Sequence, residues 1–301
     1  MVYQPNIPPF ATRPRMQHAW VPGLTSLAHH LSSNFDLSTL LLVGASLQSL
    51  LVLALRSKYA FLPSFLILLF RITDALLITF RFKPNPYLQD AFIGRRTALL
   101  PDADGQITGP GKRKVVILLL GAKSNHPLGI FAPEFKKMGG FLSRMNKLFD
   151  SPDAPEGLLG QTSFDRRDER GAREFVFISY WNSIQDLHAF AHTGLHRETW
   201  LWWEKDLKQR DYVGINHEIY EAEARAWENV YVNFQPTGLG ATTFLKRGDK
   251  VLGGVVQHEF IHPLVDARRG KLAKSSGRLG WDATQHDRER PAAEAYGTDD
   301  A

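Results

Sequence analysis

The feature that most constrains this chain is a long run without charge near its start. Residues 37–55 read LSTLLLVGASLQSLLVLAL and contain no acidic or basic side chain. A second apolar block, YAFLPSFLILLFRITDALLITF, follows at 59–80. Runs of this length can cross the hydrocarbon layer of a bilayer, roughly 30 Å thick, as helices. We therefore expect an N-terminal transmembrane helical hairpin at 37–82 that tethers the rest of the chain to a membrane.

The second block is the weaker of the two spans. Pro63 lies in its first turns, and Arg71 and Asp74 lie near its middle. The spacing of Arg71 and Asp74 allows them to pair on one helix face, which lowers the cost of burying both in lipid. The alternative is a helix that lies in the membrane interface or packs on a protein core. The sequence is compatible with both interpretations.

The distribution of basic residues predicts the orientation of such a hairpin. If both blocks cross, the two ends emerge on the same side of the membrane, and only Arg56 and Lys58 lie in the loop between them. The flanks are richer in basic residues, with Arg13, Arg15, Arg81, Lys83, Arg95 and Arg96. Because basic residues favour the cytoplasmic side, we expect a membrane protein whose soluble part faces the cytoplasm.

Composition excludes several classes of chemistry and partner. The net charge is +5, but the basic clusters lie mostly outside the middle of the chain and are not interleaved with aromatic residues. A nucleic-acid partner is therefore not expected. The chain has no cysteine, which excludes disulfides, thiolate catalysis and thiolate metal sites and fits a reducing compartment.

Composition also divides the chain into parts. A polar arm at 1–36 precedes the hairpin at 37–82, and residues 83–112 have the Pro- and Gly-rich composition of a linker. A globular domain is expected at 113–246. The extension at 247–301 is poor in large apolar residues from about Arg268 onward, so a disordered basic tail is predicted there.

The globular domain shows a repeated pattern of elements. Strands are predicted at 115–121, 158–166, 174–181 and 213–224, with helices at 131–149 and from Ile184 to about Lys208. This order, β-α-β-β-α-β, predicts an α+β fold of the ferredoxin-like type, with two helices on one face of an antiparallel sheet. A second subunit is the usual cover for the other face, so a homodimer is expected. A further strand is predicted at 229–234.

Three histidines follow one another at helical spacing on the second helix. His188, His192 and His196 are each four residues apart, and adjacent pairs at this spacing can hold zinc. All three climb ~12 Å of helix, too far for one ion. The alternative is a half-exposed polar flank, and Gly194 can break the helix. His196 lies next to Trp200 and Trp203 on the wheel and is the best candidate to line a pocket.

The last strand of the domain carries a further histidine. Alternation places His217 on one face with Val213, Ile215 and Ile219, while Glu218 and Tyr220 point to the other. A histidine among apolar neighbours is often a hydrogen-bonded core residue. With His196 and tryptophans on the facing helix, a catalytic role is an equal alternative.

Several motifs together resemble a known family. The chain is similar over about 113–246 to a fungal and bacterial monooxygenase-like family of the dimeric α+β-barrel superfamily, whose relatives include the antibiotic-biosynthesis monooxygenases. The residues that carry the resemblance are Tyr180, Trp181, His196, Arg197, Trp200, Gly214, His217, Glu218, Tyr220, Glu228, Asn229, Tyr231 and Asn233.

The resemblance implies a monooxygenase, and an oxygenase without a cofactor needs specific groups. Such an enzyme deprotonates an electron-rich substrate with a base near neutral pKa, here His196 or His217, and stabilises the anion with a donor such as Tyr180 or Asn182. Aromatic walls exclude water. The side chains expected to bind the substrate are Trp181, Trp200, Trp203, Tyr220 and Glu218.

The substrate and cofactor follow from the same resemblance. A membrane-tethered oxygenase suits O₂ and a lipophilic small molecule of secondary metabolism, of polyketide or terpenoid type, with no metal and no required cofactor. Haem is the alternative, with His196 or His192 as axial ligand of a lyase or peroxidase-like enzyme. The same fold is also compatible with an isomerase or with a non-catalytic small-molecule binding protein.

Overall fold

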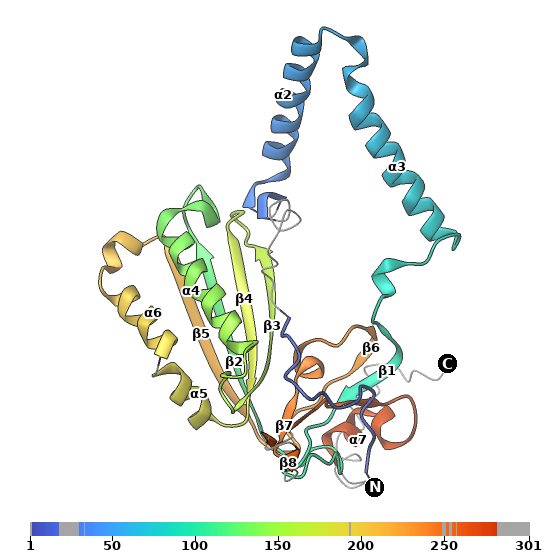
Figure 1. Ribbon diagram of the computed structural model, residues 1–301, viewed down its shortest axis with the longest axis vertical. Helices are drawn as coiled ribbons and strands as arrows, with labels where there is room; N and C mark the ends of the chain where they lie inside the picture. Colours follow the sequence, from blue (N-terminus) through green and yellow to red (C-terminus); the bar gives the residue numbers. More distant parts are fainter. Residues whose placement is uncertain are drawn as a thin grey trace, which may run out of the picture.

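A splayed pair of helices stands on a body made of one larger and several smaller sheets (Figure 1). The computed structural model describes residues 2–17, 30–32, 34–192, 194–248, 251–252, 255–256 and 258–281. The larger sheet and its helices form one side of the body, and the small sheets form the other (Figure 1).

The two apolar blocks form the helices α2 (Leu37–Leu55) and α3 (Leu62–Thr79), joined by a short 3₁₀ turn. Asp36 caps α2 by accepting the Thr39 backbone N–H at 2.6 Å. Pro63 falls in the first turn of α3, where no backbone N–H is needed. No residue of either helix is buried, and both are long and apolar enough to cross a membrane. Asp74 pairs with Lys83 beyond the end of α3.

The larger sheet has four antiparallel strands in the order β3-β4-β2-β5. Along the chain, α4 follows β2, and α5 and α6 lie between β4 and β5. The chain order is therefore β-α-β-β-α-β, the order of a split βαβ unit. The elements are β2 (Val115–Ser124), α4 (Pro133–Phe149), β3 (Leu158–Arg167), β4 (Arg173–Trp181), α5 (Ile184–Ala191), α6 (Gly194–Glu204) and β5 (Val213–Ala222).

Alternation along β4 shows how the sheet is buried. Phe175, Phe177, Ser179 and Trp181 point toward the helices and are buried, while the residues that alternate with them are only half-buried. Phe135 of α4 stacks on Phe175 with ring centroids 6.2 Å apart. Leu187 of α5 packs in the same cluster as Trp181. The core therefore lies between one face of the sheet and its helices.

The second helix of this domain is broken, which corrects the single helix predicted over 184–208. Helix α5 ends at Ala191 and α6 begins at Gly194, whose φ of 53° lies in the left-handed region. A left-handed residue cannot continue a right-handed helix, and glycine adopts this conformation at little cost. The helical wheel across this point therefore does not hold.

The segment predicted as a linker takes part in a second sheet. Strand β1 (Phe92–Ala98) lies between β6 (Tyr231–Phe234) and β11 (Leu264–Asp266). The segment predicted as a disordered extension also contains ordered elements up to residue 279, and residues 282–301 lie outside the described part. The remaining elements are β7 (Phe244–Lys246), β8 (Val251–Leu252), β9 (Val255–Val256), β10 (Glu259–Ile261) and α7 (Ser275–Leu279).

The polar arm at the start of the chain lies against this body. Tyr3 pairs with Ile107 and Phe10 with Phe260 in isolated bridges. Arg13 donates to the Leu158 carbonyl at 2.7 Å. The arm therefore contacts both the larger sheet and the smaller ones.

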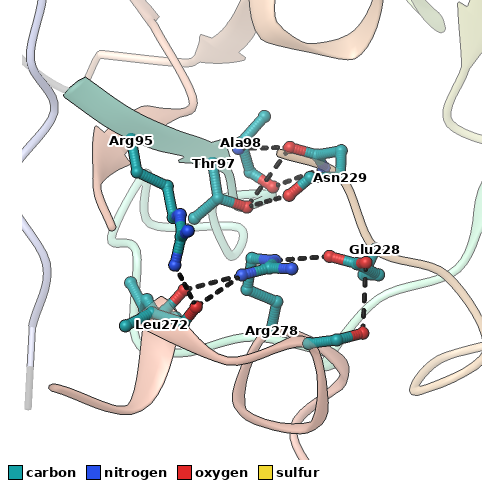
Figure 2. Close-up of polar contacts among 9 residues, drawn as sticks. Arg95, Thr97, Ala98, Glu228, Asn229, Leu272 and Arg278 are labelled. Atoms are coloured by element: carbon teal, nitrogen blue, oxygen red, sulfur yellow. Dashed lines mark hydrogen bonds and ion pairs between the residues drawn. The ribbon is translucent and has the colours of Figure 1, made fainter. Parts of the chain in front are cut away.

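A polar network fastens β1 to the segment before β6 (Figure 2). The Asn229 side chain accepts from the Ala98 N–H at 2.6 Å and donates to the Ala98 carbonyl at 3.0 Å, as a strand partner would. Thr97 donates to the Asn229 carbonyl at 2.7 Å. Beside it, Glu228 pairs with the buried Arg278, which also donates to the Leu272 carbonyl at 3.1 Å.

Replacing Asn229 tests this fastening. Asn229→Ala leaves the buried Ala98 backbone groups without their partner, so we expect the free energy of unfolding to fall by about 2–3 kcal/mol. Denaturant unfolding in mild detergent measures this. Gln185→Ala, at an exposed position of α5, serves as the control and should be silent. Equal midpoints for Asn229→Ala and the unsubstituted protein would show that the network contributes nothing.

Candidate functional site

The surface between α6 and β5 is left partly open. Ile215, His217 and Ile219 share the helix-facing side of β5, since His217 pairs with Leu120, which packs in the core. They nevertheless remain exposed, Ile215 at 42% and Ile219 at 38%. From the helix side, Trp200 is 52% exposed. The result is a half-open, mainly apolar surface that we call the α6–β5 surface.

His196 stands at this surface in a defined tautomer. Its Nδ1 lies 2.8 Å from the Ala191 carbonyl oxygen, which can only accept a hydrogen bond. Nδ1 therefore carries the proton, and the neutral ring keeps its lone pair on Nε2. Ala191 ends α5, so its carbonyl is among those that a helix end leaves without a partner. The helix break thus sets the tautomer of His196.

The charge state of His196 follows from its surroundings. Burial lowers the pKa of His196 below its usual value, and the nearby His192 and His217 lower it further, while the bond to Ala191 opposes the shift. The ring is therefore neutral at pH 7. His217 on β5 lies close enough to His196 to act on it electrostatically. Phe190 packs edge-on against the His196 ring at 5.4 Å.

Tyr180 lies on the opposite face of the sheet, away from both histidines. Its phenol oxygen accepts the Leu239 backbone N–H, and burial raises its pKa. The neighbouring Tyr231 oxygen accepts the Gly240 N–H at 2.9 Å, and burial raises its pKa too. One Gly-rich turn, residues 238–241, therefore holds both phenols. This corrects the prediction that Tyr180 shares a site with His196.

Asn182 lies at a third place, in a polar cleft at the far end of the sheet. It accepts from Arg113 Nη2 at 3.0 Å, and the Arg113 guanidinium lies 5.3 Å from the centre of the Phe244 ring. The cleft has a volume of about 260 Å³ and mixed charge. Its other charged lining residues are Asp102, Glu156, Asp186, Lys246 and Arg247. Asn182 is therefore also separate from the histidine pair.

The predicted substrate-binding residues divide in the same way. Trp181 is 1% exposed and donates to Ser179 Oγ at 2.9 Å, so it is a core residue. Tyr220 donates to Glu218, which raises the Tyr220 pKa, and both lie on the sheet face opposite His217. The structure places three of the predicted residues on the helix side, namely His196, His217 and Trp203. Trp200 lies one turn after His196 on α6 and is half-exposed.

The three histidines His188, His192 and His196 do not gather as one group of metal ligands. No group of three His, Asp or Glu side chains in the described part of the chain is arranged to hold an ion. The rings of His188 and His192 are 5.9 Å apart, while the Nδ1 of His196 is taken by Ala191. The hydrogen bond between His196 and the Ala191 carbonyl was not predicted from the sequence. Gly194, where the helix breaks, is the sequence feature that could have indicated it.

Comparison with known proteins identifies the family. The chain is 33% identical to Monooxygenase af470 from Aspergillus fumigatus over 261 residues, 85% of this chain and 91% of that protein. Residues 115–239 match the family described as Monooxygenase af470-like. The chain belongs to this family. The resemblance found in the sequence is thereby confirmed, and the af470-like chain is an enzyme of the monooxygenase class.

Solved structures show weaker likeness to this af470-like monooxygenase. An aldoxime dehydratase in complex with butyraldoxime is 20% identical and has a TM-score of 0.35, covering 50% of this chain and 36% of its own. SnoaB, a cofactor-independent oxygenase from Streptomyces nogalater, is 13% identical and has a TM-score of 0.25, covering 35% of this chain and 90% of its own. These likenesses are too distant to transfer a substrate or a cofactor.

The tautomer and pKa of His196 can be measured directly. In ¹⁵N-histidine-labelled protein we expect Nδ1 to be the protonated nitrogen, and the titration midpoint to lie below that of histidine in the urea-unfolded chain. Because the folded pKa is lowered, His196 opposes folding as pH falls below about 6.5, and this cost is absent above that value. A proton on Nε2 in the neutral ring, or a raised midpoint, would contradict the geometry.

Proposed function

We propose that the α6–β5 surface binds and oxygenates a lipophilic small molecule of secondary metabolism, of polyketide or terpenoid type. The observation that carries this proposal is the neutral His196, whose Nε2 lone pair is available beside His217 on an exposed apolar surface. A substrate with an extended apolar body would cover Trp200, Ile215 and Ile219. Tyr180 and Asn182 lie elsewhere and take no part in this proposal.

The proposed reaction needs no group beyond the substrate, O₂ and this surface. His196 removes a proton from an electron-rich methylene, and the resulting carbanion reduces O₂ to a peroxide bonded to that carbon. Loss of water then leaves a carbonyl, so that one oxygen atom joins the substrate and the other leaves as water. The methylene gives up both hydrogens and four electrons, which balances the reduction of O₂. The substrate body excludes water from the reacting atoms.

Simple measurements distinguish this oxygenase from a haem enzyme, an isomerase and a binding protein. A haem enzyme with His196 or His192 as axial ligand would show an intense visible absorption band after purification. An isomerase would convert its substrate without consuming O₂, and a binding protein would leave the substrate unchanged. An absorption spectrum followed by oxygen uptake and product analysis therefore separates the four candidate functions.

We also propose that α2 and α3 cross the membrane and hold the body on its cytoplasmic side. Their length, their apolar composition and the absence of buried residues in either helix support this placement. The greater number of basic residues outside the Arg56–Lys58 loop supports the orientation. A lipophilic substrate would be concentrated in the same membrane.

Substitution of the two histidines tests the catalytic proposal. With a panel of polyketide and terpenoid precursors and no added cofactor, His196→Ala should lower the rate of oxygen uptake by ~10²-fold, because the general base is lost. His217→Ala should also lower it. His188→Ala, on the exposed side of α5, should keep the full rate. Full activity in both His196→Ala and His217→Ala, with unfolding midpoints unchanged, would remove this pair from catalysis.

The open face of the larger sheet supports a homodimer. The helices cover one face, and the turn at 238–241 with its neighbours covers only the Tyr180 end of the other. Phe164 and Tyr220 on that face are 48% and 52% exposed, and Val176 and Ile178 are half-buried. A second copy packed face to face would bury this surface and complete a two-sheet barrel.

Sedimentation in density-matched detergent measures the assembly. We expect twice the chain mass of 34.0 kDa. Phe164→Arg should reduce it to that of one chain, because it places a charge within the proposed interface. Gln185→Arg on α5 should leave the dimer intact. A single-chain mass for the unsubstituted protein at micromolar concentration would refute the dimer.

A further inference from the structure

Both ends of the helical hairpin are fastened to the body. Before α2, Asn34 accepts from the Ile130 N–H at 3.0 Å and donates to the Leu128 carbonyl at 3.3 Å. Phe35 stacks on Phe131 with ring centroids 6.2 Å apart. We call the residues at this contact the α2 foot; they are Leu31, Asn34, Phe35, Leu128, Ile130 and Phe131.

The second fastening follows α3. Gln235 Nε2 donates to the carbonyl oxygens of Tyr87 and Gln89 at 2.9 and 3.1 Å. Farther along, the Gly94 N–H donates to Asn233 Oδ1 at 2.7 Å. This segment, residues 80–94, is the α3 foot. Because two separate contacts hold the hairpin, its insertion into a membrane also fixes the position of the body.

Large apolar side chains are exposed at both feet. At the α3 foot, Phe82 and Tyr87 are 80% and 82% exposed, and Arg81 and Lys83 lie among them. At the α2 foot, Leu128 is 52% exposed. The full set at the two feet is Leu31, Phe80, Phe82, Tyr87, Leu88, Ile93, Leu128 and Phe131.

The chemistry of these residues matches the headgroup layer of a bilayer. Aromatic side chains concentrate at membrane interfaces, where an apolar ring and a polar end are both accommodated. Arg81 and Lys83 follow α3 directly, where basic residues contact anionic headgroups. The feet are continuous with α2 and α3, which rise from the same side of the body (Figure 1).

From this arrangement we infer that the two feet form a lipid-binding surface, which seats the body against the headgroup layer instead of leaving it on a free tether. The inference rests on the proposed membrane insertion of α2 and α3. In this inference, the exposed residues of the two feet contact the interfacial layer of a phospholipid bilayer.

The seating also orients the proposed active site. The α2 foot contacts the turn after β2, so the Ser124–Val213 end of the larger sheet faces the bilayer. Along β5, Ile215 lies closer to that end than His217 does. The α6–β5 surface therefore runs from the membrane side toward His217, which shortens the path of a lipophilic substrate from the bilayer.

The lack of cysteine allows a direct test with single fluorescent labels. The full chain is reconstituted into phosphatidylcholine vesicles with a minor fraction of phosphatidylserine. An environment-sensitive dye is attached to Tyr87→Cys, Leu128→Cys, Leu66→Cys or Lys274→Cys. Leu66 lies within α3, and Lys274 lies next to α7, away from the hairpin (Figure 1). Iodide in the buffer and nitroxide lipids report exposure to water and depth in the bilayer.

The four labels test the lipid-binding surface separately from the membrane insertion of α2 and α3. We expect labels at Tyr87 and Leu128 to be quenched by headgroup nitroxides and to be several-fold less accessible to iodide than the label at Lys274. The label at Leu66 should be quenched by nitroxides deep in the acyl chains. If Leu66 is shielded but either foot is as open as Lys274, the lipid-binding surface is refuted and the hairpin stands. If Leu66 is equally open, the membrane insertion itself fails.

Discussion

The structure depends first on the pairing of β2, which lies between β4 and β5 and is bonded to both along nearly its whole length. Its alternating side chains define the two sides of the body. Val116 and Ala122 point into the two clusters beneath the helices, while Val115 and Ile117 pack with the smaller sheets. A shift of one residue would exchange these faces, so the register of β2 determines which histidines and tyrosines can meet.

The motif from Glu228 to Asn233 has a structural role in this arrangement of strands. Its polar members, which carried part of the family resemblance, bond to separate partners elsewhere in the chain. Glu228 pairs with Arg278, Asn229 imitates a strand partner for Ala98, and Asn233 receives the Gly94 N–H. These contacts tie together β1, which follows the hairpin, and the C-terminal elements. The motif therefore holds the segment after the hairpin in place, and its polarity is satisfied internally.

Local patterns in the sequence predicted the elements that depend on neighbouring residues. The charge-free run matches α2 at Leu37–Leu55, and the order of strands and helices from Val115 to Ala222 follows the periodicity. Strand β1 was missed because it lies among prolines and glycines and gains its stability from β6 and β11, far along the chain. The separation of Tyr180 from His196 was not predicted, because alternation within one strand does not show which of its two faces meets the helices. Alternation places Tyr180 and Trp181 on opposite faces, and only pairing with β2 shows which face meets α6.

The contrast between His196 and His217 indicates how the proposed site becomes catalytic. His196 is half-buried and its orientation is fixed by Ala191, whereas His217 stands exposed on an edge strand. The protein alone therefore orients the proposed base but leaves the surface exposed to water. Covering the exposed parts of Ile215 and Ile219 would contribute on the order of 2 kcal/mol, about 30-fold in affinity. A substrate with an apolar body supplies this cover and at the same time removes water from around His196 and His217. Affinity and the low-dielectric surroundings that favour proton transfer thus arise from the same contact, which is why a polar substrate of equal acidity should react more slowly at this surface.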